Sequence, residues 1–213
     1  MRALIYVPIV HSKADLGELG REVTKHLKAT VGAERTDLRR DSIDAMWSVI
    51  RSKLLAMPLP WTSVRVYQDG LPICDHEMAI VRELGAQGSL NHALLLELID
   101  RGAALMGTER PELLVREYQR IQRLVAVARQ PSPDPEEILA LRREGEELLA
   151  ERDASIASRI LSTLVEGERG VLFIGLLHRV DELLAGELRI QHLIRNLPVG
   201  AEPPRDIQTR RKT

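Results

Sequence analysis

The sequence predicts an α/β fold, in which a single domain contains a mostly parallel β-sheet of four to five strands flanked by helices. Two observations support this prediction. Short runs such as 3–7 and 171–175 are apolar throughout, as expected for strands that a parallel sheet buries on both faces. Segments with helical spacing of apolar residues separate the strand-like runs, and strands that alternate with helices are typical of parallel sheets.

Four segments have the composition of core strands, and a fifth is ambiguous. The run at 2–10 is rich in Ile, Val and Tyr, and residues 63–69 alternate and are rich in β-forming residues. Residues 102–109 predict a short third strand, and 171–175 the fourth. Residues 187–193 are typical of either an edge strand or a short helix.

Helices are predicted where apolar residues recur every three or four positions. Ser89 is a suitable N-cap, and Asp134, followed by Pro135 and Glu137, has the pattern of a capping box. A turn is predicted at 70–72, where the sequence reads Gly-Leu-Pro. The predicted helices cover 14–30, 41–57, 75–85, 89–101, 111–129, 134–166 and 179–185.

The chain is long enough for one sizeable core, because 44% of its 213 residues are hydrophobic. We expect one α/β domain over residues 1–197, with the helical segment 110–166 packing on it. From Pro198 onward the chain contains a Pro-Pro pair and then basic residues, so 198–213 is predicted to be a flexible tail.

Composition narrows the classes of partner. The chain has 30 basic and 31 acidic residues and only 3% aromatic residues, so we expect no nucleic-acid partner. No apolar run approaches the ~18 residues that span a bilayer, so no membrane segment is expected. The single cysteine, Cys74, excludes an internal disulfide and fits a cytoplasmic location. A homo-oligomer is compatible with the apolar helix faces predicted at 14–30 and 41–57.

Histidines and acids follow the predicted strands. His11, Asp69, Glu109 and His178 stand at or just beyond the four strand ends. Because the carboxyl ends of parallel strands share one edge, where α/β sheets bind ligands, these side chains predict a common site. Two imidazoles and two carboxylates can bind a divalent metal ion or activate water as general bases. The alternative is that polar residues follow strands simply because the chain reaches the surface there.

Two charged residues interrupt the apolar stripe of the long helix predicted at 134–166. Arg152 lies four residues after Leu148, and Asp153 lies four after Leu149, so both point close to the buried face. A charge in that position usually has a partner or a ligand. The alternatives are a network between Arg152 and Asp153, or a boundary position from which the arginine reaches water.

Residues 148–184 resemble the erythromycin esterase / ChaN / TraB-like superfamily. In that family a helix with Glu-Arg-Asp or Glu-Arg-Asn precedes a strand that ends in Gly-x-x-His, and the matching residues here are Glu151, Arg152, Asp153, Gly175 and His178. An early family strand ends in Gly-x-x-His or Gly-Glu-x-His. The segment Pro-Ile-Val-His at 8–11 is similar, with Pro and Ile in place of Gly and Glu.

The resemblance implies a site of histidines and acids at the strand ends, in a family that includes hydrolases and haem-binding proteins. The first hypothesis is a hydrolase of the esterase or metal-dependent peptidase type, acting on a small molecule or a peptide. In this hypothesis His11 and His178 bind a metal ion or activate water, and Asp69 or Glu109 completes the coordination or orients an imidazole. Arg152 stabilises an anionic transition state, and Asp153 holds Arg152, with Glu151 beside them. Two alternatives remain open: a module that binds metal, haem or another small ligand without turnover, and a structural or assembly protein of the same fold.

Overall fold

The computed structural model describes residues 2–10 and 33–194, with side chains for 2–10 and 41–194. The helix predicted at 14–30 and the tail predicted at 198–213 lie outside this range. The helices and strands follow one another along the chain as β1 (Ala3–Ile9), α2 (Ala33–Leu55), a 3-10 turn (Trp61–Ser63), β2 (Val64–Pro72), α3 (Glu77–Ala86), α4 (Leu90–Asp100), β3 (Ala104–Glu109), α5 (Pro111–Ala128), α6 (Pro135–Thr163), β4 (Arg169–Gly175), α7 (Val180–Leu184) and β5 (Arg189–His192).

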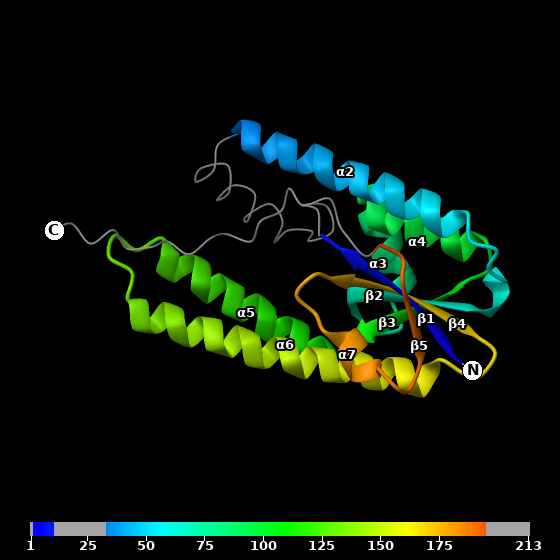
Figure 1. Ribbon diagram of the computed structural model, residues 1–213. Helices are drawn as coiled ribbons and strands as arrows, with labels where there is room; N and C mark the ends of the chain where they lie inside the picture. Colours follow the sequence, from blue (N-terminus) through cyan, green and yellow to red (C-terminus); the bar gives the residue numbers. More distant parts are fainter. Residues whose placement is uncertain (1, 11–32, 195–213) are drawn as a thin grey trace.

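The five strands form one parallel sheet in the order β3-β2-β4-β1-β5, which confirms the predicted α/β fold (Figure 1). The ambiguous segment is an edge strand, β5, that pairs with β1. The prediction of a turn at 70–72 is wrong, because β2 continues to Pro72. Its glycine nevertheless has a special role: Gly70 has φ 77°, and the β2–β3 register shifts between Gln68 and Pro72. An irregularity of this kind re-aims neighbouring side chains, here beside Asp69.

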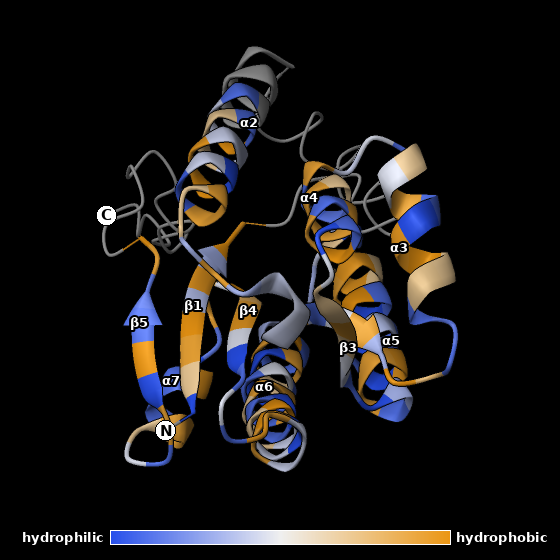
Figure 2. Ribbon diagram, turned by 90° about the vertical axis from the view of Figure 1, so that its right-hand side faces the viewer, coloured by the Kyte–Doolittle hydropathy of each residue, from blue (hydrophilic) through white to orange (hydrophobic). Residues whose placement is uncertain are grey.

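Helices cover both faces of the sheet. Alternate strand residues such as Val66 and Phe173 pack against α2 and α4 on one face, with Trp47 of α2 6.2 Å from the Phe173 ring. The opposite set, including Leu172, packs against α6 and α7, where Ile156 and Ile160 are buried. This two-sided burial explains why β1 is apolar along most of its length (Figure 2), since neither face of a covered strand meets water.

The predicted helical segment 110–166 is a hairpin of two helices, α5 and α6. The two helices lie side by side and project beyond the sheet, and only the later part of the 29-residue α6 packs on it (Figure 1). Asp134 caps α6 as predicted, and its carboxylate accepts from the backbone N–H of Glu136 at 2.9 Å. No helix in the described part of the chain is long and apolar enough to cross a bilayer.

The strand order fixes where the loops diverge. The connection that leaves β2 leads to β3 at one edge of the sheet, while the connection that leaves β4 leads to β5 at the opposite edge. The two connections therefore separate between the neighbouring strands β2 and β4. In an α/β sheet, such a switch point at the carboxyl ends of the strands is where ligands bind.

Candidate functional site

Five charged or titratable side chains meet at this switch point, on the face that α6 covers. Asp69 belongs to β2, Glu109 ends β3, and His178 follows β4. Arg152 and Asp153 reach the same edge from α6. The sequence predicted that these strand ends share one edge, and the structure brings all five side chains into one network of hydrogen bonds and ion pairs.

Arg152 joins the two strand-end carboxylates of this network. Its Nη2 lies 2.7 Å from Glu109 Oε1 and 3.0 Å from Asp69 Oδ1, and its Nε lies 3.2 Å from Glu109 Oε1. A planar guanidinium suits this task because its N–H groups point in fixed directions and can engage two acids at once. The Arg152 charge is therefore shared between Asp69 and Glu109.

Asp153 makes a separate set of contacts with the β4–α7 connection. Its Oδ1 hydrogen-bonds to His178 Nδ1, and its Oδ2 accepts from the backbone N–H of Arg179 at 2.9 Å. A carboxylate beside Nδ1 requires that this nitrogen carry a proton, and it fixes the orientation of the ring. The nitrogen that remains to exchange a proton is therefore His178 Nε2.

Asp69 connects the two halves of the network. One oxygen, Oδ1, binds Arg152, while Oδ2 accepts from the backbone N–H of Gly175 at 2.9 Å. The same Oδ2 lies 3.5 Å from His178 Nε2, which is longer than an ordinary N–H···O hydrogen bond. Asp69 therefore faces the reactive edge of the imidazole without a close bond to it.

The network is largely shielded from water, since its five side chains are between 0% and 11% exposed. Burial raises the pKa of Glu109, although the Arg152 guanidinium beside it pulls that pKa down. Burial also raises the pKa of Tyr6, and the carboxylates of Asp181 and Asp153 act in the same direction. The Tyr6 hydroxyl donates to the backbone carbonyl of His178 at 3.4 Å, so a protonated phenol stands at the margin of the site.

The raised pKa of Glu109 predicts how stability depends on pH. The folded chain keeps this proton to a higher pH than the unfolded chain, whose Glu109 titrates near 4.5. The contribution of Glu109 to stability is thus complete below pH 4.5 and is lost as the pH rises to the folded pKa. Glu109→Gln removes this titration, so the variant should gain stability relative to the wild type as the pH rises from 4.5. Urea unfolding of both proteins across this range tests it, and a constant or opposite difference would contradict it.

Two of the predicted roles differ in the structure. Glu151 does not join the network: its carboxylate pairs with the exposed Arg116 of α5. The hydrolase hypothesis expected Asp153 to hold Arg152. Instead, the described partners of Asp153 are His178 and Arg179. The physical reason is helix geometry, since consecutive residues point roughly 100° apart around the axis and reach different neighbours.

The predicted metal site depends on His11, which lies outside the described residues. Within the described part of the chain, no three His, Cys, Asp or Glu side chains are grouped so as to hold a metal ion. Arg152 bridges Asp69 and Glu109, and two of the predicted ligands thereby have a cation already. The divalent metal stays a prediction.

Sequence reasoning missed the contribution of the backbone and of Tyr6. The backbone N–H groups of Gly175 and Arg179 donate to buried carboxylates. The residue types at these positions do not predict such bonds. Tyr6 offered a weak signal, because a buried tyrosine in an apolar strand usually has a partner for its hydroxyl.

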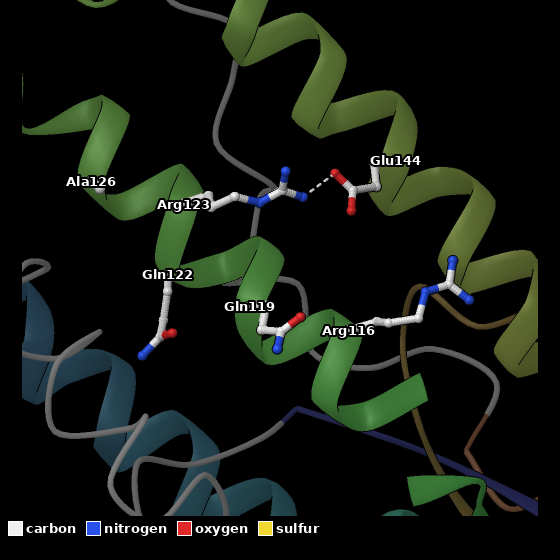
Figure 3. Close-up of a pocket in the computed structure, with 6 residues that line it drawn as sticks. All are labelled: Arg116, Gln119, Gln122, Arg123, Ala126 and Glu144. Carbon is white, nitrogen blue, oxygen red and sulfur yellow. Dashed lines mark hydrogen bonds and ion pairs between the residues drawn. The ribbon is translucent and has the colours of Figure 1, made fainter. Parts of the chain in front are cut away.

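A surface cleft lies elsewhere, on the α5–α6 hairpin (Figure 3). Its volume is about 680 Å³, and an ion pair between Arg123 and Glu144 lies across the two helices. The cleft shares no residue with the network at the strand ends. It is lined by Arg116, Gln119, Gln122, Arg123, Ala126 and Glu144.

Comparison with known proteins yields no match to a family model, to a curated protein or to a solved structure.

Proposed function

We propose that the protein is a hydrolase in which His178 acts as the general base and general acid. The observation that carries the proposal is the arrangement of three groups: Asp153 on Nδ1, the imidazole of His178, and Asp69 3.5 Å from Nε2. A histidine that is oriented by one carboxylate, and whose second nitrogen faces another carboxylate at the carboxyl edge of the sheet, is suited to proton transfer to and from water.

In the proposed reaction, a water molecule attacks the carbonyl carbon of an ester. His178 Nε2 takes the proton of this water as the new C–O bond forms, and Asp153 stabilises the imidazolium that results. When the bond to the leaving group breaks, Nε2 returns the proton to the departing alkoxide. The products are a carboxylic acid and an alcohol, and the imidazole is neutral again.

Arg152 has a positioning role in this proposal. Because its guanidinium already binds Asp69 and Glu109, it fixes the two acids and thereby the surroundings of Nε2. The sequence analysis assigned to Arg152 the stabilisation of an anionic transition state. In this proposal another hydrogen-bond donor has that role.

Steady-state hydrolysis of p-nitrophenyl esters by the purified full chain tests the proposal, both with EDTA and with added divalent metal ions. His178→Asn keeps a donor for Asp153 but cannot transfer a proton at Nε2, so kcat should fall by at least ~100-fold. Asp153→Asn should also lower kcat, because an amide no longer fixes the tautomer. Glu151→Gln is the matched control, because Glu151 lies two positions before Asp153 on the same helix but is exposed, and this variant should keep the wild-type kcat.

The experiment separates the proposal from the two alternatives. Folded His178→Asn protein with unchanged ester hydrolysis would exclude His178 as the proton carrier. A wild-type chain that hydrolyses no p-nitrophenyl ester, either with EDTA or with added divalent metal ions, would contradict the hydrolase proposal. Activity that needs a metal ion and disappears in His11→Ala would instead support the predicted metal site.

A further inference from the structure

Three buried side chains on the face of the sheet that α2 and α4 cover carry polar atoms without a partner in the described chain. Trp47, Gln68 and Asn91 are 2%, 1% and 0% exposed. Trp47 Nε1, Gln68 Oε1 and both amide atoms of Asn91 have no hydrogen-bond partner among the described residues. Folded proteins bond the great majority of their buried polar atoms, either to the protein itself or to ordered water. These atoms therefore require a partner from outside the described chain.

Trp47 and Gln68 lie beside the same phenyl ring. The ring centroids of Trp47 and Phe173 are 6.2 Å apart, and Gln68 is the register partner of Phe173 in the β2–β4 ladder. Register partners point to the same face of a sheet, and Phe173 belongs to the apolar cluster that includes residues of α2 and α4. A donor, the indole N–H, and an acceptor, Gln68 Oε1, therefore lie around one ring without a direct bond between them.

Asn91 reaches the same face from the first turn of α4. It lies on the same side of the helix as the buried leucines that follow it by three, four and seven residues. These leucines belong to the apolar cluster that contains Phe173, and they are Leu94, Leu95 and Leu98. Because α4 ends just before β3 begins, its first turn lies at the carboxyl edge of the sheet. Gln68 lies in the later part of β2, so both amides occupy the same end of this face.

The donors and acceptors of these atoms identify the chemistry of their partner. Gln68 Nε2 donates to the backbone carbonyl of Asp69 at 2.8 Å, which leaves Oε1 to accept. Trp47 Nε1 can only donate, and the Asn91 amide both donates and accepts. An ion would satisfy only part of this set, and none of the three side chains supplies a counter-charge for it. Water both donates and accepts, and a buried water typically binds about three such groups.

We infer that ordered water binds at the carboxyl end of this face, where it accepts from Trp47 and donates to Gln68, and Asn91 completes the site. The row of β2 side chains supports this position, because Gln68 continues the alternation of the buried Val64 and Val66 with a polar residue. The β2–β3 register also shifts directly after Gln68, and such a shift interrupts the regular strand ladder.

The water site is separate from the network around His178. Gln68 and Asp69 are consecutive residues of β2, so their side chains point to opposite faces of the sheet. The inference therefore does not depend on the proposed hydrolase function, and its failure would leave that proposal intact.

Water–protein nuclear Overhauser effects in the isotope-labelled full chain test the inference. A long-lived water should give a cross-peak to the indole N–H of Trp47 and another to the side-chain amide of Asn91, each with NOE and ROE of opposite sign. Trp61→Phe shows which of the two indole signals belongs to Trp47. In Gln68→Leu, which removes the acceptor, the cross-peak at Trp47 should be lost. Gln119→Leu is the matched control, because Gln119 is exposed on α5, and it should keep the cross-peak.

Three other results would overturn the inference. Folded wild-type protein without a water cross-peak at Trp47 and Asn91 would show that no long-lived water binds there. A cross-peak at Trp47 that is unchanged in folded Gln68→Leu would show that Gln68 does not hold the water. A small molecule that native mass spectrometry finds on the wild-type chain, but not on Asn91→Leu, would identify a different ligand at this position. The wild-type cross-peaks decide the question even where a variant does not fold.

Discussion

Arg152→Ala is expected to lower the free energy of unfolding by about 3–5 kcal/mol, the range measured when one partner of a buried ion pair is removed. The substitution leaves Asp69 and Glu109 facing each other without their shared cation, and these side chains are only 2% and 0% exposed. Two buried carboxylates without a counter-charge must take up a proton or reorganise, and both responses cost free energy. Urea unfolding followed by circular dichroism at neutral pH measures the loss.

Arg116→Ala is the matched control for this prediction. Arg116 also pairs with a glutamate, Glu151, across α5 and α6, but both side chains are exposed. An exposed ion pair contributes only about 0–1 kcal/mol, so the variant should unfold close to the wild-type urea concentration. A comparable loss in both variants would show that burial does not distinguish the two pairs.

A double variant tests whether the loss comes from the unpaired charge. In this variant, Arg152→Met fills part of the space of the arginine with an apolar side chain, and Glu109→Gln removes one of the two carboxylates that have lost their cation. The double variant should therefore be more stable than Arg152→Met alone, since the two residues share one interaction and their effects do not add. Additive losses would contradict the direct pairing of Arg152 with Glu109.

Asp153→Ala is expected to destabilise the protein by about 2–4 kcal/mol, because one buried and one partly buried donor lose their acceptor. An unsatisfied donor costs about 1–3 kcal/mol, and the partly buried one lies at the low end of this range because water reaches it. The donors are His178 Nδ1 and the backbone N–H of Arg179. The turn that carries Leu176 and Leu177 should loosen at this end. Amide hydrogen exchange should therefore quicken at Arg179.

The same measurement contains its own control. The N–H of Gly175 is held by Asp69 and not by Asp153, so its exchange should change much less than that of Arg179. Asp153→Asn provides a second comparison, since an amide oxygen can still accept one of the two bonds. Equal acceleration at Gly175 and Arg179 would indicate global unfolding and would contradict a local role for Asp153.

Much of the fold follows from local patterns. The strands 2–10 and 171–175 were predictable because a parallel sheet buries both strand faces and so demands continuous apolar runs. Ser89 and Asp134 cap α4 and α6 as predicted, because capping depends on contacts within a few residues. Whether 187–193 forms a strand or a helix was not predictable, since an edge strand and a short helix bury similar apolar residues at this length.

The sequence by itself determined which residues reach the site. Parallel strands share their carboxyl edge, so Asp69, Glu109 and His178 had to lie along one side of the sheet, and helical spacing placed Arg152 and Asp153 near the buried face of α6. Only the tertiary structure decided which of them bind one another. The rotation of α6 against the sheet directs Arg152 to the two strand-end acids, Asp153 to the β4–α7 turn and Glu151 to α5. That rotation is set by the packing of the whole helix on the sheet, through residues such as Ile156 and Ile160, and no short stretch of sequence contains it.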